Sequence, residues 1–137
     1  MRCVLDTTAF SAAMRRDESL FELLKKYRPG DIVTVPPVVA EIQYGIERID
    51  KSSKKYYLLK SERDRLLSVI SVLPWSPESS DQFGKIKAEL EHSGKLIDDF
   101  DIAIAAIAVS HKCCIISANP KHFQRIKNLK SKSWKKK

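Results

Sequence analysis

Acidic and amide side chains stand at four separate places in this chain, each beside a short apolar run. These residues are Asp6, Glu41, Asp101 and Asn119. Oxygen ligands of this kind suit Mg²⁺ or Mn²⁺, which takes one or two carboxylates and leaves positions for water and phosphate oxygens. Such a cation lowers the pKa of water and offsets charge on a leaving oxygen. The residue types therefore indicate hydrolysis of a phosphodiester, provided that the fold brings the four places together.

Asp98 and Asp99 stand just before Asp101 and add to the acidic character of that segment. Either of them could contact the same cation. Acidic residues at a helix start also cap the backbone and interact favourably with the helix dipole, so for Asp98 and Asp99 both interpretations stay open. Glu41 alone would be an ordinary surface residue, and Asn119 before Pro120 is a common turn former. Only their shared placement makes them candidates for one site.

The elements that must position these residues can be predicted from apolar patterning. Short apolar runs predict strands at residues 3–5, 32–35 and 113–117, and helical spacing predicts helices over 19–27, 37–49, 52–70, 79–92 and 97–109, with a short extended piece at 72–75. Alternation of short apolar strands with longer helices is typical of a parallel sheet with helices on both faces. Ligands of such α/β sheets bind outside the carboxyl ends of the strands, where the four residues would converge.

Length and charge favour one domain with a basic end. The chain has 137 residues, and its formal net charge of +8 lies entirely in residues 121–137, which hold eight lysines and arginines and no acid. We expect a domain over residues 1–125 and a basic segment over 126–137 that packs partly on it. This segment either meets phosphate backbones or serves solubility. Without a membrane-spanning run or a signal peptide, the expected location is the cytoplasm.

The three cysteines are predicted to have no special chemistry. Cys113 and Cys114 lie in an apolar run, where a thiol packs as a small hydrophobic group. Neither they nor Cys3 stand at zinc-ligand spacing with a histidine. We therefore expect neither a disulfide nor a zinc site.

Four segments carry a resemblance to a known family. Val4–Thr8 resembles the opening LLDTN of PIN-domain toxins, and residues 39–48 resemble their xxxELxxGxxR helix. Residues 101–106 resemble DxxIAA, and residues 116–134 resemble TxNxxHFxxIxxLxxxxW. The resemblance covers essentially the whole chain in the right order.

The resemblance implies a single PIN domain of the VapC type, an endoribonuclease that binds Mg²⁺ or Mn²⁺ and acts as the toxin of a toxin–antitoxin pair. It implies that Asp6 and Asp101 are the main metal carboxylates, that Glu41 acts through a water or as a base, and that Asn119 completes the catalytic set. Family members commonly form homodimers. A VapB-type antitoxin silences them by inserting its C-terminal segment into the acidic cleft.

Two positions depart from the family pattern. Thr8 stands where asparagine is usual and Ser117 where threonine is common, yet both keep a hydroxyl group. We expect altered substrate or metal geometry and retained activity. Thr7, Thr8, Ser117 and Lys121 are the candidates for contacts to substrate. Asn119 replaces the aspartate of many other PIN nucleases, so the site should hold fewer metal ions tightly.

Basic residues also gather on the predicted middle helix, where they either attract RNA or form a solvated face. They are Lys51, Lys54, Lys55, Lys60, Arg63 and Arg65.

Two other enzyme classes need acidic residues that this chain lacks. A dehalogenase-type phosphatase needs a second acid two residues after its nucleophile, where this chain has Thr8, and a phospho-receiver domain needs acidic neighbours that Asp6 lacks. The remaining alternative is a PIN-like domain that binds RNA or a protein without cleavage. Intact Asp6, Glu41 and Asp101 argue against it.

Overall fold

A five-stranded, wholly parallel sheet forms the centre of the computed structural model, which describes residues 1–135. The strand order is β3-β2-β1-β4-β5. The strands are β1 (Cys3–Leu5), β2 (Ile32–Thr34), β3 (Ser71–Val72), β4 (Cys114–Ile116) and β5 (Ser131–Lys132). The three central strands are buried at every position, which explains why they appear in the sequence as continuous apolar runs. Two residues of the predicted basic segment, Lys136 and Lys137, lie outside the described residues.

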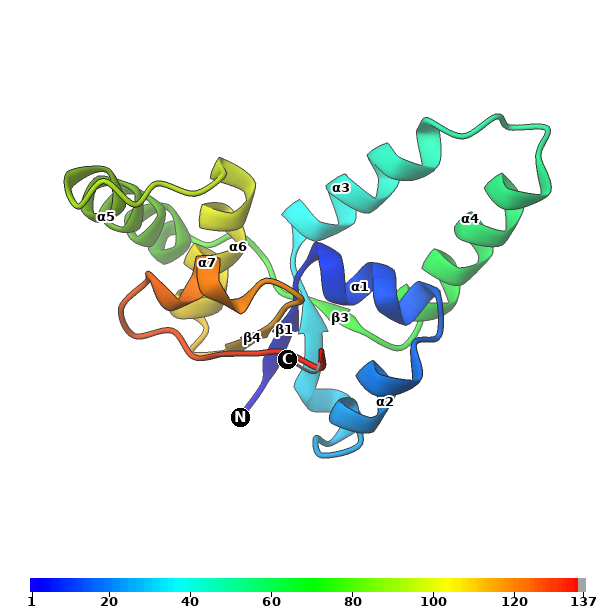
Figure 1. Cartoon of the computed structure of the whole chain (residues 1–137), viewed down its shortest axis with the longest axis horizontal. Helices are drawn as coiled ribbons and strands as arrows, with labels where there is room; N and C mark the ends of the chain where they lie inside the picture. The colour runs from blue at the N-terminus through cyan, green and yellow to red at the C-terminus, as the bar shows by residue number, and fades with distance from the viewer. Residues whose placement is uncertain (136–137) are drawn as a thin grey trace.

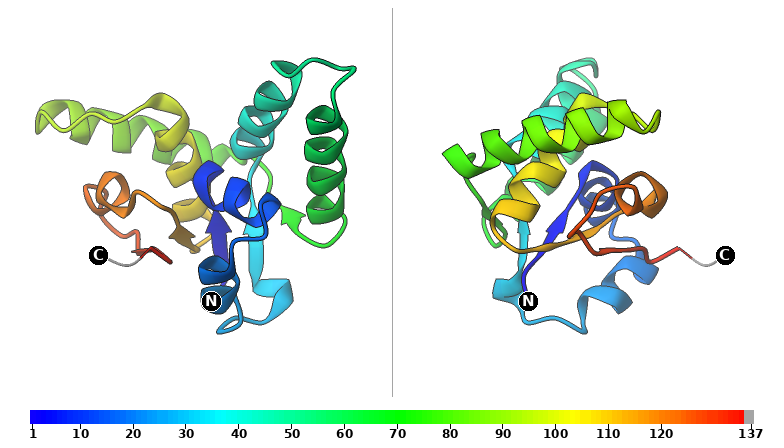
Figure 2. Two further views of the ribbon diagram at one scale, coloured as in Figure 1. Left: turned by 45° about the vertical axis from the view of Figure 1, so that its right-hand side comes forward. Right: turned by 90° about the vertical axis from the view of Figure 1, so that its left-hand side faces the viewer.

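Helices cover the sheet on both sides, as predicted. They are α1 (Thr7–Met14), α2 (Glu18–Leu24), α3 (Pro36–Glu47), α4 (Lys54–Leu67), α5 (Pro77–His92), α6 (Asp99–Ser110) and α7 (Pro120–Gln124), with a 3-10 turn η1 (Pro29–Asp31). α5 and α6 rise on one side of β1, α3 and α4 rise on the other, and α1 lies between the two pairs (Figures 1 and 2). The α/β prediction is confirmed.

α6 is the central helix of the core. Six of its residues, from Ile102 to Ala108, are buried, so the apolar run predicted to be enclosed on most sides is enclosed. Phe123 of α7 and Trp134 after β5 are also buried and close the core beyond β4. In the described part of the chain, no helix has the length and apolar character needed to cross a membrane.

The first helix, α1, is absent from the prediction. Residues 6–8 have the composition of a turn, but the structure continues them directly into a helix that Asp6 caps. Five of the eight α1 residues are buried, so this helix lacks the polar face that helical periodicity detects. β5, a two-residue edge strand, also carries no pattern strong enough to predict it.

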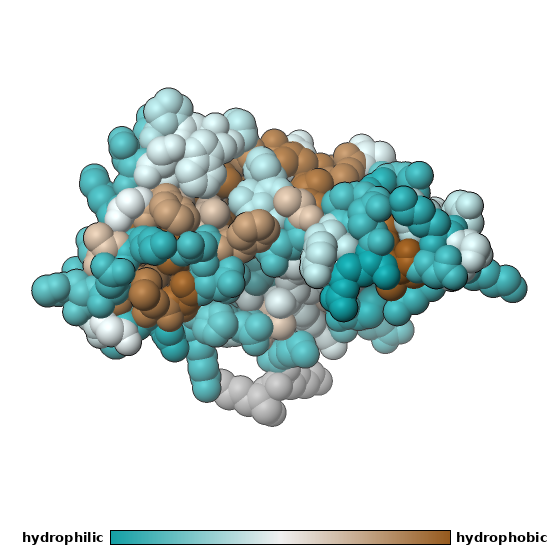
Figure 3. All heavy atoms as spheres, turned by 90° about the horizontal axis from the view of Figure 1, so that it is seen from above, coloured by the Kyte–Doolittle hydropathy of each residue, from teal (hydrophilic) through white to brown (hydrophobic). Residues whose placement is uncertain are grey.

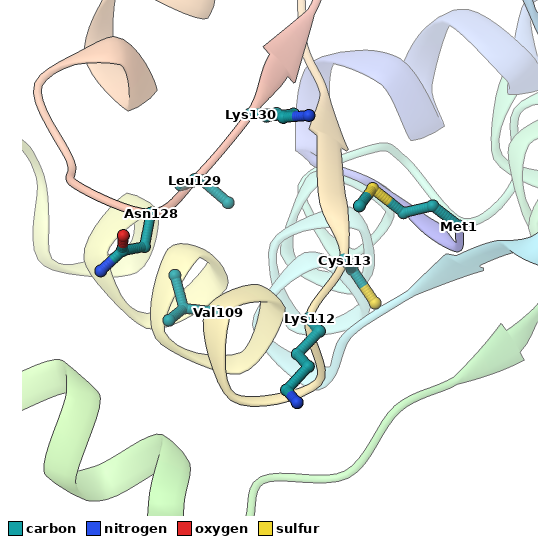
Figure 4. Close-up of a pocket in the computed structure, with 7 residues that line it drawn as sticks. All are labelled: Met1, Val109, Lys112, Cys113, Asn128, Leu129 and Lys130. Carbon is teal, nitrogen blue, oxygen red and sulfur yellow. The ribbon is translucent and has the colours of Figure 1, made fainter.

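The expectation that no disulfide forms is wrong, because Cys3 and Cys114 are joined. These residues pair in register on the neighbouring strands β1 and β4, with 4.5 Å between their Cα atoms, although 111 residues separate them in sequence. Cys113 is a free, buried thiol, as expected. It lines a cavity of about 480 Å³ with Met1, Lys112 and Lys130, at the amino ends of the strands (Figure 4).

Candidate active site

Asp6 stands where β1 passes into α1, and the local fold fixes its carboxylate. Its Oδ1 accepts a hydrogen bond from the Ala9 amide at 2.9 Å, which caps α1, and another from the Thr8 hydroxyl at 2.6 Å. The Ser117 hydroxyl, at the end of β4, supports the same carboxylate. The side chain is held by donors from two segments while only 4% of the residue is exposed.

Burial raises the pKa of Asp6 above its ordinary value, because a desolvated carboxylate loses its hydration. The hydrogen bonds from Ser117, Thr8 and Ala9 oppose this shift without cancelling it. An ionised Asp6 therefore has a free-energy cost in this protein that a bound cation would offset.

Asp101 lies in the first turn of α6. Like Asp6, it belongs to the rim of the sheet formed by the carboxyl ends of the strands. Burial raises its pKa, and the negative charges of Asp6 and Asp98 raise it further, whereas His122 lowers it. The Nδ1 atom of His122 lies 3.4 Å from Oδ2 of Asp101. The electrostatic effect of Asp6 on Asp101 indicates that the fold brings the two carboxylates together, although 95 residues separate them in sequence.

Glu41 joins this rim from α3. Pro36 at the first position of α3 starts the helix after β2, and Glu41 follows just over one turn later. The Thr7 hydroxyl donates a 2.6 Å hydrogen bond to Oε1 of Glu41. Consecutive residues of α1 therefore hold two acids: Thr7 holds Glu41 and Thr8 holds Asp6.

The segment after β4 completes the rim. The Ala118 amide donates to the Thr8 hydroxyl at 2.8 Å, and the Asn119 amide donates to the Ser117 hydroxyl at 2.9 Å. Asn119 is exposed beside this pair and precedes α7 without capping it through its side chain. Asp6, Glu41, Asp101 and Asn119 thus come from four segments, each beside the carboxyl end of a strand or the start of a helix.

The sequence-family model described as PIN domain matches residues 3–129 of this chain. This chain belongs to the PIN-domain family. Ribonuclease VapC2 of Haemophilus influenzae is 30% identical to it over 136 residues, 98% of each chain.

Solved structures share the PIN fold over nearly the full chain. VapBC2 from Rickettsia felis, bound to a DNA fragment from their promoter, superposes with a TM-score of 0.85 at 30% identity, covering 98% of this chain and 100% of that one. VapBC-1 from nontypeable Haemophilus influenzae superposes with a TM-score of 0.84 at 27% identity, covering 99% and 100%. Both structures are toxin–antitoxin complexes.

Three further predicted site residues are exposed, although the charge of Asp98 still raises the pKa of Asp101. Asp98 caps α6 by accepting a 2.8 Å hydrogen bond from the Phe100 amide, and Asp99 forms a surface ion pair with Lys87 at 3.1 Å. Lys121 is exposed on α7. His122 is not among the predicted site residues, although its position three residues after Asn119, in the short helix α7, could have suggested a role.

The basic residues of α4 are partly neutralised within the chain. Arg65 pairs with Glu62 and Arg63 with Asp64, and Lys51, just before the helix, pairs with Glu47. These ion pairs favour a solvated face for this part of the domain.

The donor set of the PIN domain fits one hard divalent cation. Within residues 1–135, no three acidic, histidine or cysteine side chains gather tightly enough to form a metal cluster by themselves. Mg²⁺ needs less than that, since it commonly takes one or two carboxylates and completes its shell with water and substrate oxygens. Asp6 and Asp101 supply two carboxylates whose pKa values are raised mainly by burial, so a bound cation would stabilise their ionised forms.

We predict that Thr8→Val destabilises the protein by about 1–2 kcal/mol, because the Ala118 amide loses its acceptor. The substitution also removes a donor that lowers the pKa of Asp6, so the acidic limb of the pH–activity profile should move to higher pH. Urea unfolding and activity against pH measure the two effects. Thr8→Ser, which keeps the hydroxyl, is the control. A Thr8→Val protein as stable as the wild type would contradict this role of Thr8.

Proposed function

We propose that this PIN domain is a divalent-metal-dependent endoribonuclease and the toxin of a type II toxin–antitoxin system. The observation that carries the proposal is the pair of carboxylates, Asp6 and Asp101, whose charges interact at the carboxyl edge of the sheet. The full-length similarity to a protein named ribonuclease VapC2 supports the choice of RNA as substrate. The proposed location is the cytoplasm, where such an enzyme would meet its RNA substrate.

Asp6 and Asp101 would hold Mg²⁺ or Mn²⁺, and the amide oxygen of Asn119 would complete the site as a neutral donor. When bound, such an ion offsets the charge that develops on the scissile phosphate and makes water a better nucleophile. The protein's own contribution is a carboxylate held in place, because the Thr8 hydroxyl and the Ala9 amide both donate to Oδ1 of Asp6.

Glu41 is suited to accept a proton from the attacking water. An ionised carboxylate accepts hydrogen bonds only, and Thr7 already occupies Oε1, which leaves Oε2 available for water. His122, beside Asp101, helps to orient that carboxylate.

A VapB-type antitoxin is the proposed inhibitor. Its C-terminal segment would enter the acidic rim, where a cationic side chain competes with the metal for Asp6 and Asp101. An apolar groove of about 300 Å³ between α1 and α3 opens beside Glu41 and supports this route, since Ile42, Ile46 and Leu59 line it. Viewed from the carboxyl ends of the strands, separate hydrophobic patches interrupt a largely hydrophilic surface (Figure 3).

The active form is proposed to be a homodimer, as is common in PIN-domain toxins. Large apolar side chains that stay exposed on the single chain support it, among them Tyr44, Leu96 and Phe100. Light scattering of the purified protein should give twice the mass of the chain, and a monomer at micromolar concentration would reject this part of the proposal.

Incubation of the purified protein with total cellular RNA tests the main proposal. With Mg²⁺ or Mn²⁺ we expect discrete fragments, and mapping of their new 5′ ends should show cuts inside the chains. The alternative is an RNA-binding or protein-binding PIN-like domain without activity. RNA that binds but acquires no new ends after long incubation with either metal would favour that alternative.

A further inference from the structure

α1 forms a wall between two hollows. Thr7, Ser11 and Arg15 follow one another at intervals of four residues, and all three line both hollows. The hollow toward α3 is the apolar groove described above. The other faces the C-terminal segment and measures about 410 Å³. Polar side chains dominate its lining, with hydroxyl, amide and cationic groups.

The polar hollow runs from the candidate active site to two cations. Thr8 and Asn119 line it at the catalytic end, and Arg15 and Lys135 also line it. Lys135 is held there by the chain before it. The Ser117 amide donates to the Lys132 carbonyl at 2.9 Å, and Trp134 is buried with 8% exposure, so β5 and Trp134 anchor the basic segment beside α1.

In the described part of the chain, no acidic partner explains the position of these two cations. Arg16, next in the chain, pairs with Glu62 at 3.0 Å, and Arg63 and Arg65 also have carboxylate partners. Among residues 1–135, neither Arg15 nor Lys135 forms an ion pair. Two uncompensated cations and several hydroxyl groups facing one hollow are suited to an anion with several acceptor oxygens.

We propose that this hollow binds a backbone phosphate of the RNA adjacent to the scissile phosphate, with Arg15 and Lys135 as its cationic contacts. The inference rests on the proposed nuclease function and assigns a path to its substrate. A strand whose scissile phosphate meets Asp6 and Asp101 can continue along α1 into this hollow, since Thr8 and Asn119 line its catalytic end. The groove on the α3 side also has Arg15 and Lys55 in its lining, but the rest is mostly apolar and includes the Glu41 carboxylate, which repels phosphate. The described lining of the polar hollow has two cations and no carboxylate, so this hollow is the better site for a phosphate.

RNA binding without cleavage tests this subsite separately from catalysis. The probe is a fluorescein-labelled, 20-nucleotide single-stranded RNA of mixed sequence, measured by anisotropy in EDTA over a series of KCl concentrations. We expect Arg15→Gln and Lys135→Gln each to weaken binding about 5-fold at low salt. Each should also reduce the slope of log Kd against log salt by about 0.7, the value for one single-strand phosphate contact.

Arg28→Gln is the matched control, since it removes the same charge from an exposed residue before η1, at the amino end of β2. It should leave affinity and slope within about twofold of the wild type. Equal affinity and slope in the Arg15, Lys135 and Arg28 variants would overturn the subsite and leave the hollow to another ligand, such as an acidic peptide. Because EDTA prevents cleavage, failure of the nuclease proposal would show only in the cleavage assay.

Discussion

Asp101→Asn is expected to lower RNA cleavage by about 100-fold or more while the domain stays folded. The substitution keeps the size of the side chain and removes one of two carboxylates whose charges interact at the carboxyl edge of the sheet. A cation held by Asp6 alone would bind more weakly and would offset less charge in the transition state. Initial rates on the mapped RNA, with circular dichroism to monitor folding, measure the effect.

Asp99→Asn is the matched control for this variant. Asp99 is two residues away and equally acidic, but its side chain is 61% exposed and pairs with Lys87 on the surface. We expect its cleavage rate to stay within about twofold of the wild type. Equal rates for the wild type and Asp101→Asn would contradict the assignment of Asp101.

Asp6→Asn is expected to make the metal-free protein more stable at neutral pH. Burial raises the pKa of Asp6 above 3.8, its ordinary value, so the folded state binds a proton more tightly than the unfolded state does. The protonated form favours folding below pH 3.8, and that advantage is lost as the pH rises through the folded-state pKa. An uncharged asparagine avoids this loss and still offers an oxygen to the Ala9 amide.

Divalent metal should reverse this order of stability, so that the wild type becomes more stable than Asp6→Asn. A cation that binds only the folded state stabilises it by about 2.7 kcal/mol when its concentration is a hundred times Kd. We therefore expect Mn²⁺ to raise the Tm of the wild type by several degrees and that of Asp6→Asn hardly at all. Calorimetry in EDTA measures the stability of the two metal-free proteins, and calorimetry in Mn²⁺ measures how far the ion raises the Tm of each. Equal Mn²⁺-induced shifts in the two proteins would show that Asp6 does not hold the ion.

The sequence predicted most of the sheet and the positions of the acids, because those depend on local patterns. The apolar run before Asp6 and the apolar helix after Asp101 could each be recognised within about ten residues. The general rule that ligands bind at the carboxyl edge of a parallel sheet then predicted that the acids lie at one edge.

Interactions between distant segments could not be predicted in this way. The hydrogen bond from Thr7 to Glu41 and the contact of His122 with Asp101 depend on how helices pack across the sheet. The disulfide between Cys3 and Cys114 depends on strand register. The polar hollow is lined by both Arg15 and Lys135, which are 120 residues apart in sequence. No local pattern indicates that they lie near each other.

The most direct test of the central claim is a cleavage assay on total cellular RNA that combines two changes, metal against EDTA and wild type against Asp6→Ala. The carboxylate pair predicts discrete fragments only in wild-type protein with Mg²⁺ or Mn²⁺, and intact RNA in the other three reactions. The same fragments from wild-type protein in EDTA, or from Asp6→Ala with metal, would contradict a metal-dependent site built on Asp6.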